Sequence, residues 1–350
     1  MRNMLSALIL GLSVASVSTA PAQPVEDARG SGYRLEEGPN EVGTLDPLVL
    51  RDAARNKELQ CTVRFPTGAA EPLALVVFSH GAGGDRRAFG ELSAHWASWG
   101  FVVVHPTHSD SVRLRREQGE SIPDVRREMR NIVSKVDLPS RVGDARLVLD
   151  SLVEIERATG VRIDRERLAM AGHSAGALTT QIMAGVKVRS ARKFGGETGP
   201  LRVGSAGDGR IKAAVVISGQ GASRLLSAES WNELDLPMLV ITGSKDTSMV
   251  SDETPESRRM PFDLAKPGDK FLLFIEGATH SSYQGRQPAA ILDLVGENAP
   301  ADIGMIVDAT TSATTAFLDA YLRDDTDAKA YLTSDELERF TAGRALLSDK

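Results

Sequence analysis

A regular alternation of short apolar runs with segments of helical spacing constrains the fold of this chain most strongly. Between the apolar runs, residues such as Phe89, Leu92 and Trp96 recur at the spacing of one helical face. The pattern over residues 303–322 predicts a closing helix. Apolar strands that alternate with helices are typical of a mostly parallel sheet covered on both faces. The sequence therefore predicts an α/β fold with a single domain over residues 45–350. The apolar runs cover residues 73–79, 101–105, 168–171, 213–218, 238–242 and 270–275.

The first 22 residues have the three-part pattern of a secretory signal peptide. Arg2 precedes an apolar run over residues 4–17, and small residues follow up to Ala22, where we expect cleavage. The alternative is an uncleaved N-terminal anchor, but the run is shorter than the roughly 20 residues that a spanning helix needs. We therefore expect an exported protein, periplasmic or secreted, in which residues 23–44 form a flexible lead into the domain.

The net charge and the cysteine content argue against two classes of protein, namely general nucleic-acid-binding proteins and domains held by internal disulfides. The formal net charge of −6 argues against general nucleic-acid binding, which favours a basic face. Cys61 is the only cysteine, so no internal disulfide is predicted. Its apolar neighbours Val63 and Phe65 indicate a strand and a buried structural thiol.

Three segments interrupt the alternation of strands and helices. Residues 107–139 are highly charged and rich in arginine, residues 186–210 are polar and glycine-rich, and residues 247–268 mix proline with charge. In an α/β sheet, insertions at the carboxyl ends of strands surround the ligand crevice. We interpret the first as a partial lid and the others as rim loops. For the arginines, a solvated helical face is favoured over an anion site.

The sequence GHSAG at residues 172–176 places Ser174 between two glycines, directly after a predicted strand and before a helical run. Gly-x-Ser-x-Gly in this context is the pattern of a nucleophile elbow. Flanking glycines are needed there because side chains would collide with the neighbouring strand and helix. The alternative interpretation is a serine that only caps the helix.

A serine nucleophile needs a base, and the base needs a carboxylate to orient it. His280 is the only histidine after Ser174, and it lies just past the last predicted strand. Asp246 follows the strand at 238–242, so the chain order is Ser, Asp, His, as this architecture requires. Asp252 and Glu253 are the alternatives for the acid.

Acyl transfer also needs two N–H donors for the negative oxygen of the intermediate. The backbone N–H of Ala175 is one candidate, and the glycine-rich loop at residues 80–84 supplies the other. We assign it to Ala82, with Gly83 as the alternative. A phosphate cradle is the competing interpretation of this loop, but the Gly-Lys-Ser/Thr ending of a P-loop is missing.

The remaining histidines near these motifs have less specific interpretations. His105 and His108 lie three residues apart, but no other metal-ligand motif accompanies them, so no metal is predicted. Gly83, His108 and His173 are candidates for the wall of a substrate pocket. His80 and His173 lie inside motifs whose backbone carries the chemistry, which favours a packing role for both.

Taken together, these motifs resemble those of serine hydrolases with the α/β-hydrolase fold, in particular the secreted bacterial branch related to dienelactone hydrolases and platelet-activating-factor acetylhydrolases. The resemblance covers roughly residues 60–323. True dienelactone hydrolases carry a cysteine nucleophile where this chain has Ser174, so dienelactone is not carried over as a substrate. The motifs that carry the resemblance are FSHGAGG at 78–84, GHSAGA at 172–177, GSKD at 243–246, GATH at 277–280 and TAFLDAYL at 315–322.

The resemblance implies hydrolysis of carboxylic esters through a Ser174–His280–Asp246 triad, without a metal or organic cofactor. The substrate is then a small-molecule or lipid ester. The same machinery serves lipases and phospholipid acetylhydrolases, polyester depolymerases and amidases, which stay open as alternatives. A non-catalytic binding protein on a hydrolase scaffold is the alternative from another class.

Overall fold

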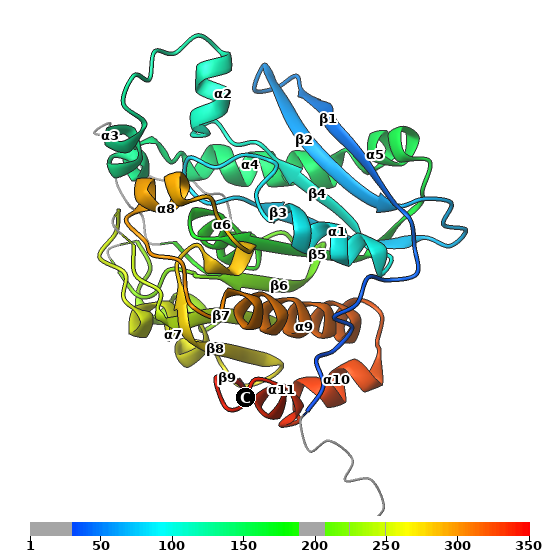
Figure 1. Cartoon of the computed structure of the whole chain (residues 1–350). Coiled ribbons are helices and arrows are strands. Elements are labelled where there is room, and N and C mark those ends of the chain that lie inside the picture. Colours follow the sequence, from blue (N-terminus) through cyan, green and yellow to red (C-terminus); the bar gives the residue numbers. More distant parts are fainter. Residues whose placement is uncertain (1–29, 189–206, 224, 249) are drawn as a thin grey trace, which may run out of the picture.

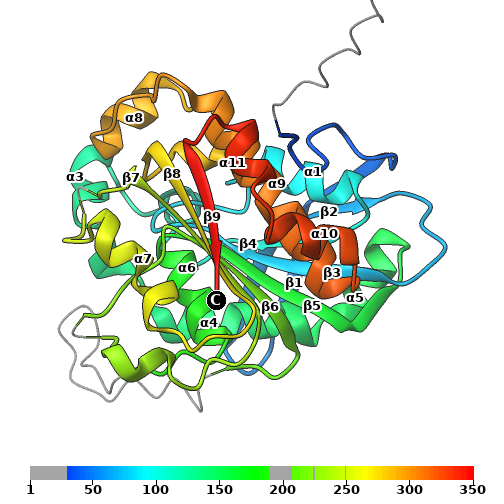
Figure 2. The same ribbon diagram turned by 90° about the horizontal axis from the view of Figure 1, so that it is seen from below.

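The computed structural model describes residues 30–188, 207–223, 225–248 and 250–350. The predicted signal peptide and most of the predicted rim loop at 186–210 lie outside these ranges. Within them the chain has a mixed α/β architecture, in which a twisted sheet is flanked by helices on both faces, consistent with the α/β-hydrolase fold (Figures 1 and 2).

Nine strands of the described residues form one sheet in the order β1-β2-β4-β3-β5-β6-β7-β8-β9. The strands from β4 to β8 pair in parallel, as the apolar runs predict. Both edges are antiparallel, where β2 pairs with β1 and β4, and β9 with β8. The strands are β1 (Val42–Asp52), β2 (Lys57–Pro66), β3 (Leu73–Ser79), β4 (Val102–Pro106), β5 (Ile163–His173), β6 (Ile211–Ile217), β7 (Met238–Lys245), β8 (Lys270–Thr279) and β9 (Ala345–Asp349).

Alternate side chains of the central strands face two separate apolar layers. Along β3, Leu75 and Val77 point into one layer, and Val76 and Phe78 point into the other. The first layer is covered by α4 (Leu138–Asp150), α5 (Leu152–Thr159), α6 (Ala175–Met183) and α7 (Pro255–Leu264). The second is covered by α1 (Gly90–Ser98), α9 (Ile303–Leu322), α10 (Thr326–Leu332) and α11 (Glu336–Phe340).

The N-terminal lead differs from its prediction. Residues 30–41 are not a loose tail, because they lie along α9 and α10, and β1 already begins at Val42 (Figure 1). The Tyr33 N–H donates to Ser312 Oγ at 2.6 Å, and its ring packs against that of Tyr331. The Arg34 guanidinium pairs with the buried Asp319. Specific contacts therefore hold a segment whose composition predicts flexibility.

Residues 107–139 form the insertion that the sequence predicts as a lid. They contain α2 (Val112–Glu117), α3 (Val125–Arg130) and the short 3₁₀ helix η1 (Ile132–Lys135), and α3 lies next to α8 (Ala289–Val295) (Figure 1). The arginines of the described insertion are not uniformly solvated, because Arg115 is buried and pairs with Glu120 and Glu128.

Two further 3₁₀ helices complete the described elements, η2 (Ala228–Trp231) and η3 (Ser282–Gln284). Among the described residues, no helix combines the length and the apolar character that crossing a membrane requires. Cys61 is fully buried on β2, as its apolar neighbours predict.

Candidate active site

Ser174 sits in a strained turn between β5 and α6. Its φ of 55° and ψ of −119° lie in a region that residues other than glycine rarely adopt. A Cβ on Gly172 would lie 2.3 Å from the Gly176 carbonyl oxygen, and a Cβ on Gly176 would lie 1.9 Å from the Ser79 carbonyl oxygen. Both flanking positions therefore require glycine, and the turn holds the serine at the carboxyl edge of the sheet.

Ser174, His280 and Asp246 form one hydrogen-bonded chain. His280 Nε2 lies 3.0 Å from Ser174 Oγ, and His280 Nδ1 lies 2.9 Å from Asp246 Oδ1. The three residues follow β5, β8 and β7, whose carboxyl ends meet at the same edge of the sheet. Since the hydroxyl, imidazole and carboxylate are all within hydrogen-bond reach, a proton can pass from Ser174 to an imidazole that Asp246 orients.

The environment of Asp246 keeps it ionised although it is buried. Burial raises the pKa of the Asp246 carboxyl, but the Arg258 guanidinium 3.0 Å away and hydrogen bonds from His280 and Ser218 outweigh it and hold the pKa well below its usual range. The other carboxylate oxygen accepts from Thr242 and from Tyr283, each at 3.0 Å. Both oxygens are fully committed, which fixes the orientation of the carboxylate.

The alternatives for the acid are not among the described residues that bond the His280 ring, which are Ser174, Ser218 and Asp246. Asp252 is exposed, and Glu253 bonds Ser257 at the start of α7. Ser218 and Arg258 also surround Asp246, and no pattern in the sequence indicates either contact. Ser218 directly follows β6 and has a φ of 55°, which no motif in the sequence signals. Arg258 is one of many arginines in a charged segment, and only the fold shows that it is buried.

The loop after β3 carries the second candidate oxyanion donor. Ala82 lines the same cavity as Ser174 and Ala175. The Gly83 N–H donates to Asp110 Oδ2 at 2.9 Å, and the Gly84 N–H donates to the Gly81 carbonyl at 3.1 Å. Of the two donors predicted in this loop, Ala82 therefore stays the candidate. The Ala175 N–H is the first of α6, where backbone donors have no partner within the helix.

A buried ion pair holds this loop in place. Arg141 on α4 binds both carboxylate oxygens of Asp110, at 2.9 and 2.8 Å, and both residues are almost fully buried. The same guanidinium donates to the carbonyl oxygens of His80 at 2.8 Å and Gly81 at 3.3 Å. Asp110 and Arg141 thus connect the insertion, α4 and the loop, and neither was singled out from the sequence.

His108 does not line the substrate pocket, which corrects its prediction. It is fully buried beneath the loop, where its ring bonds Ser79 Oγ at 2.8 Å and Asp144 at 3.0 Å. Its backbone N–H donates to His80 Nε2 at 3.0 Å. His108 and His80 therefore support the loop. His105 instead stacks on Phe78 at a centroid distance of 4.8 Å.

His173 lies beside the base rather than in the proton chain. Its Nε2–H donates to the His280 carbonyl oxygen at 2.7 Å, and the two rings are 4.8 Å apart. Burial, together with the neighbouring His280, lowers the pKa of His173 to about 3, so the ring stays neutral. His173 and Gly83 both line the cavity that His280 also lines, and their contact with a substrate stays a prediction.

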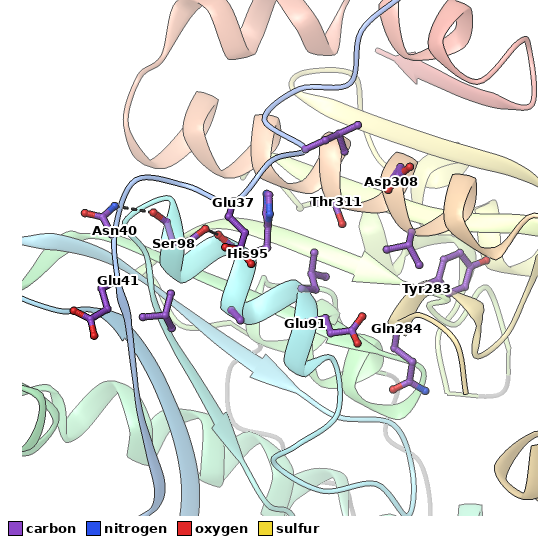
Figure 3. Close-up of a pocket in the computed structure, with 15 residues that line it drawn as sticks. Glu37, Asn40, Glu41, Glu91, His95, Ser98, Tyr283, Gln284, Asp308 and Thr311 are labelled. Carbon is purple, nitrogen blue, oxygen red and sulfur yellow. Dashed lines mark hydrogen bonds between the residues drawn. The ribbon is translucent and has the colours of Figure 1, made fainter. Parts of the chain in front are cut away.

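Two cavities open at Ser174. One has a volume of about 690 Å³ and is also lined by Ala175 and Leu178, and the other has about 310 Å³ and is also lined by His280. A separate groove of about 540 Å³ lies beside η3, between the N-terminal lead, α1 and α9 (Figure 3). Its lining includes Glu91, His95 and Asp308 and leaves out Ser174, so we place the candidate active site at the first two cavities.

Comparison with known proteins gives a family match for the N-terminal part of the chain. The model of a family described as platelet-activating factor acetylhydrolase, isoform II, matches residues 47–116. That match includes the loop after β3 and ends before Ser174, Asp246 and His280. No curated protein matches the chain. The chain is therefore similar, over its N-terminal part, to a family of hydrolases that act on esters.

Proposed function

We propose that this protein is a serine hydrolase that cleaves carboxylic esters through Ser174, His280 and Asp246. The observation that carries the proposal is the continuous chain of contacts from Ser174 Oγ through both nitrogens of His280 to Asp246. The strained serine turn and the ester-hydrolase family match over residues 47–116 support it independently.

The proposed reaction begins with attack of Ser174 Oγ on the ester carbonyl carbon while its proton moves to His280 Nε2. The N–H groups of Ala82 and Ala175 stabilise the negative oxygen of the tetrahedral intermediate. The carbon–oxygen bond to the alcohol then breaks, and His280 gives its proton to the leaving oxygen. Asp246 stabilises the imidazolium and stays ionised throughout.

Water completes the cycle by the reverse order of steps. His280 removes a proton from a water molecule, the hydroxide oxygen attacks the acyl carbon, and Ser174 leaves with the proton from His280. Apart from the water molecule, each step uses side chains and backbone N–H groups of this chain. The insertion at 107–139 walls part of both cavities through Val112, Met129 and Val133, which supports its role as a partial lid.

Hydrolysis of a short activated ester tests the proposal. The purified chain should hydrolyse 4-nitrophenyl acetate, and His280→Gln should lower kcat by several orders of magnitude because the base is lost. Hydrolysis at the wild-type rate by the His280→Gln variant would contradict the proposal.

Export is a second part of the proposal, supported by the residue pattern at 1–22 alone. Expression of the full chain in a bacterial host should give a mature protein that starts at Gln23, read by N-terminal sequencing of the periplasmic or secreted fraction. A chain that keeps residues 1–22 and stays in the cytoplasm would contradict it.

A further inference from the structure

The two cavities at Ser174 differ in which catalytic group they contain. His280 lines the cavity of about 310 Å³, whereas the lining of the cavity of about 690 Å³ includes Ala175 and Leu178 but not His280. Besides Ser174, the residues Ala82, Ser248 and Val250 line both cavities, so they lie at the boundary between them. We call the first the His280-side cavity and the second the α6-side cavity.

The chemistry of the proposed reaction assigns a substrate group to each cavity, and the inference below rests on that proposed function. The leaving oxygen must lie next to His280 Nε2, since this nitrogen protonates it. The alcohol therefore extends into the His280-side cavity. The acyl chain occupies the other substituent position on the tetrahedral carbon, which directs it into the α6-side cavity.

The α6-side cavity suits a neutral aliphatic chain. The apolar part of its lining includes Val136, Leu138, Leu178, Leu225 and Leu226. Its volume of about 690 Å³ is well within the range of sites that hold drug-sized ligands.

The charged residues of this lining disfavour an acyl chain that ends in a carboxylate. Among the described residues that line the α6-side cavity, the charged ones are Asp252 and Glu253, and both are acidic. A carboxylate on the acyl chain would meet like charge there and find no cationic partner in the lining.

The His280-side cavity suits a compact apolar alcohol. Phe89, Met129, Ile132 and Leu294 give it a largely apolar wall, and its volume of about 310 Å³ lies near the lower end for ligand sites. We propose that the site is specific for esters of neutral, medium-length aliphatic acids with small apolar alcohols, and that Val136 and Leu294 limit the acyl and alcohol groups respectively.

Two ester series test this assignment. In one, the alcohol is 4-nitrophenol and the acyl group lengthens from acetate to octanoate. In the other, the acyl group is acetate and the alcohol grows from methyl to naphthyl. Wild-type kcat/KM should rise at least about tenfold from acetate to hexanoate, because each added methylene buries apolar surface. The adipate half ester should react at least about tenfold more slowly than the hexanoate.

A matched pair of variants separates the two cavities. Val136→Trp should lower the octanoate-to-acetate ratio of kcat/KM at least about tenfold, since only the α6-side cavity is narrowed. Leu294→Trp should lower the naphthyl-to-methyl ratio of kcat/KM at least about tenfold and leave the chain-length dependence of the 4-nitrophenyl series unchanged. Val136 and Leu294 are partly exposed, but Val136 also packs against the core, so thermal unfolding of both variants verifies that the fold is retained.

The outcomes separate this inference from the proposed function. Exchanged effects of the two variants, or a wild-type preference for the adipate half ester over the hexanoate, would overturn the assignment while Ser174-dependent ester hydrolysis stands. Failure of the wild-type protein to hydrolyse any member of either series would overturn both.

Discussion

The carboxylate of Asp110 accepts a hydrogen bond from the Gly83 backbone N–H at 2.9 Å, in the loop that faces Ser174. This contact takes Gly83 out of competition for the oxyanion and leaves Ala82 as the candidate of this loop. Asp110 is itself held by the buried Arg141. The geometry of the proposed oxyanion hole therefore depends on an ion pair that does not touch the substrate.

Replacing Asp110 with Asn should lower kcat by about 10²-fold while KM changes little, because a misplaced N–H donor weakens the transition state more than substrate binding. The variant should also lose about 3–5 kcal/mol of stability, since it leaves a buried guanidinium without its partner charge. Steady-state kinetics and urea unfolding measure both quantities.

Asp85→Asn is the matched control for Asp110→Asn. Asp85 closely follows Gly83 in the sequence, but its carboxylate accepts a hydrogen bond from the Arg87 N–H and none from Gly83. This control should keep wild-type kcat. A kcat for Asp110→Asn within about twofold of wild type would show that Ala82 needs no such support.

Asp246→Asn should lower kcat by about 10⁴-fold, because an amide neither stabilises the imidazolium nor selects the productive tautomer of His280. Asp252→Asn removes a carboxylate from the same loop region and should leave turnover of a neutral ester near the wild-type value. Parallel kinetics on 4-nitrophenyl acetate compare the two variants. The opposite ranking would move the acid from Asp246 to Asp252.

Gly176→Ala should destabilise the protein by about 3 kcal/mol or more, since the added methyl would lie 1.9 Å from the Ser79 carbonyl oxygen. Gly304→Ala is its matched control. Gly304 is an exposed position on α9 where an added methyl would meet open space. Gly304→Ala should therefore raise the free energy of unfolding by about 0.5–1 kcal/mol. Thermal unfolding of both variants checks the pair, and equal effects would show that the serine turn tolerates a side chain.

His105 predicts a pH dependence of stability. Burial, with a smaller contribution from Arg64, lowers the pKa of His105 to about 3, and both ring nitrogens lack a hydrogen-bond partner among the described residues. An unfolded histidine has a pKa of about 6.5, so between about pH 3 and pH 6.5 the unfolded state binds the additional proton. The stabilising effect is fully present above about pH 6.5 and is lost as the pH falls.

Between pH 7.5 and pH 5.0 the wild-type protein should therefore lose about 2 kcal/mol more of its unfolding free energy than His105→Leu does. Urea unfolding at the two pH values measures this difference. Parallel losses in both proteins would mean that His105 binds its proton equally in the folded and unfolded states.

Much of the central sheet and the closing helix could be predicted, because apolar runs and helical spacing within short segments of the sequence indicate them. The apolar runs of β3 and β6 coincide with their strands within a residue or two, and the closing helix is α9 over the predicted residues. The glycines at 172 and 176 indicate the serine turn because the Gly-x-Ser-x-Gly pattern between a strand and a helix is contiguous in the sequence. Chain order then brings His280 and Asp246 to it.

The edges of the sheet and the supports of the site could not be predicted, since they depend on distant contacts. The strands β1 and β9 alternate weakly between exposed and buried positions, so their sequence lacks the apolar run that marks a central strand. The spacing of Leu147, Leu149, Leu152 and Ile155 predicts one helix that starts near Ser140. The chain instead leaves helical geometry at Ser151, whose φ is −103° and ψ is 24°, and forms two helices, α4 and α5. His108 and Arg141 acquire their roles only through burial.

The central claim is that His280 activates Ser174 as a nucleophile, and covalent labelling tests it most directly. A fluorophosphonate should react with the wild-type protein at one position, which peptide mass spectrometry places on Ser174. His280→Ala should slow the labelling by at least about 10³-fold. An adduct on another serine, such as Ser218 or Ser79, or full labelling of Ser174→Ala, would contradict the account.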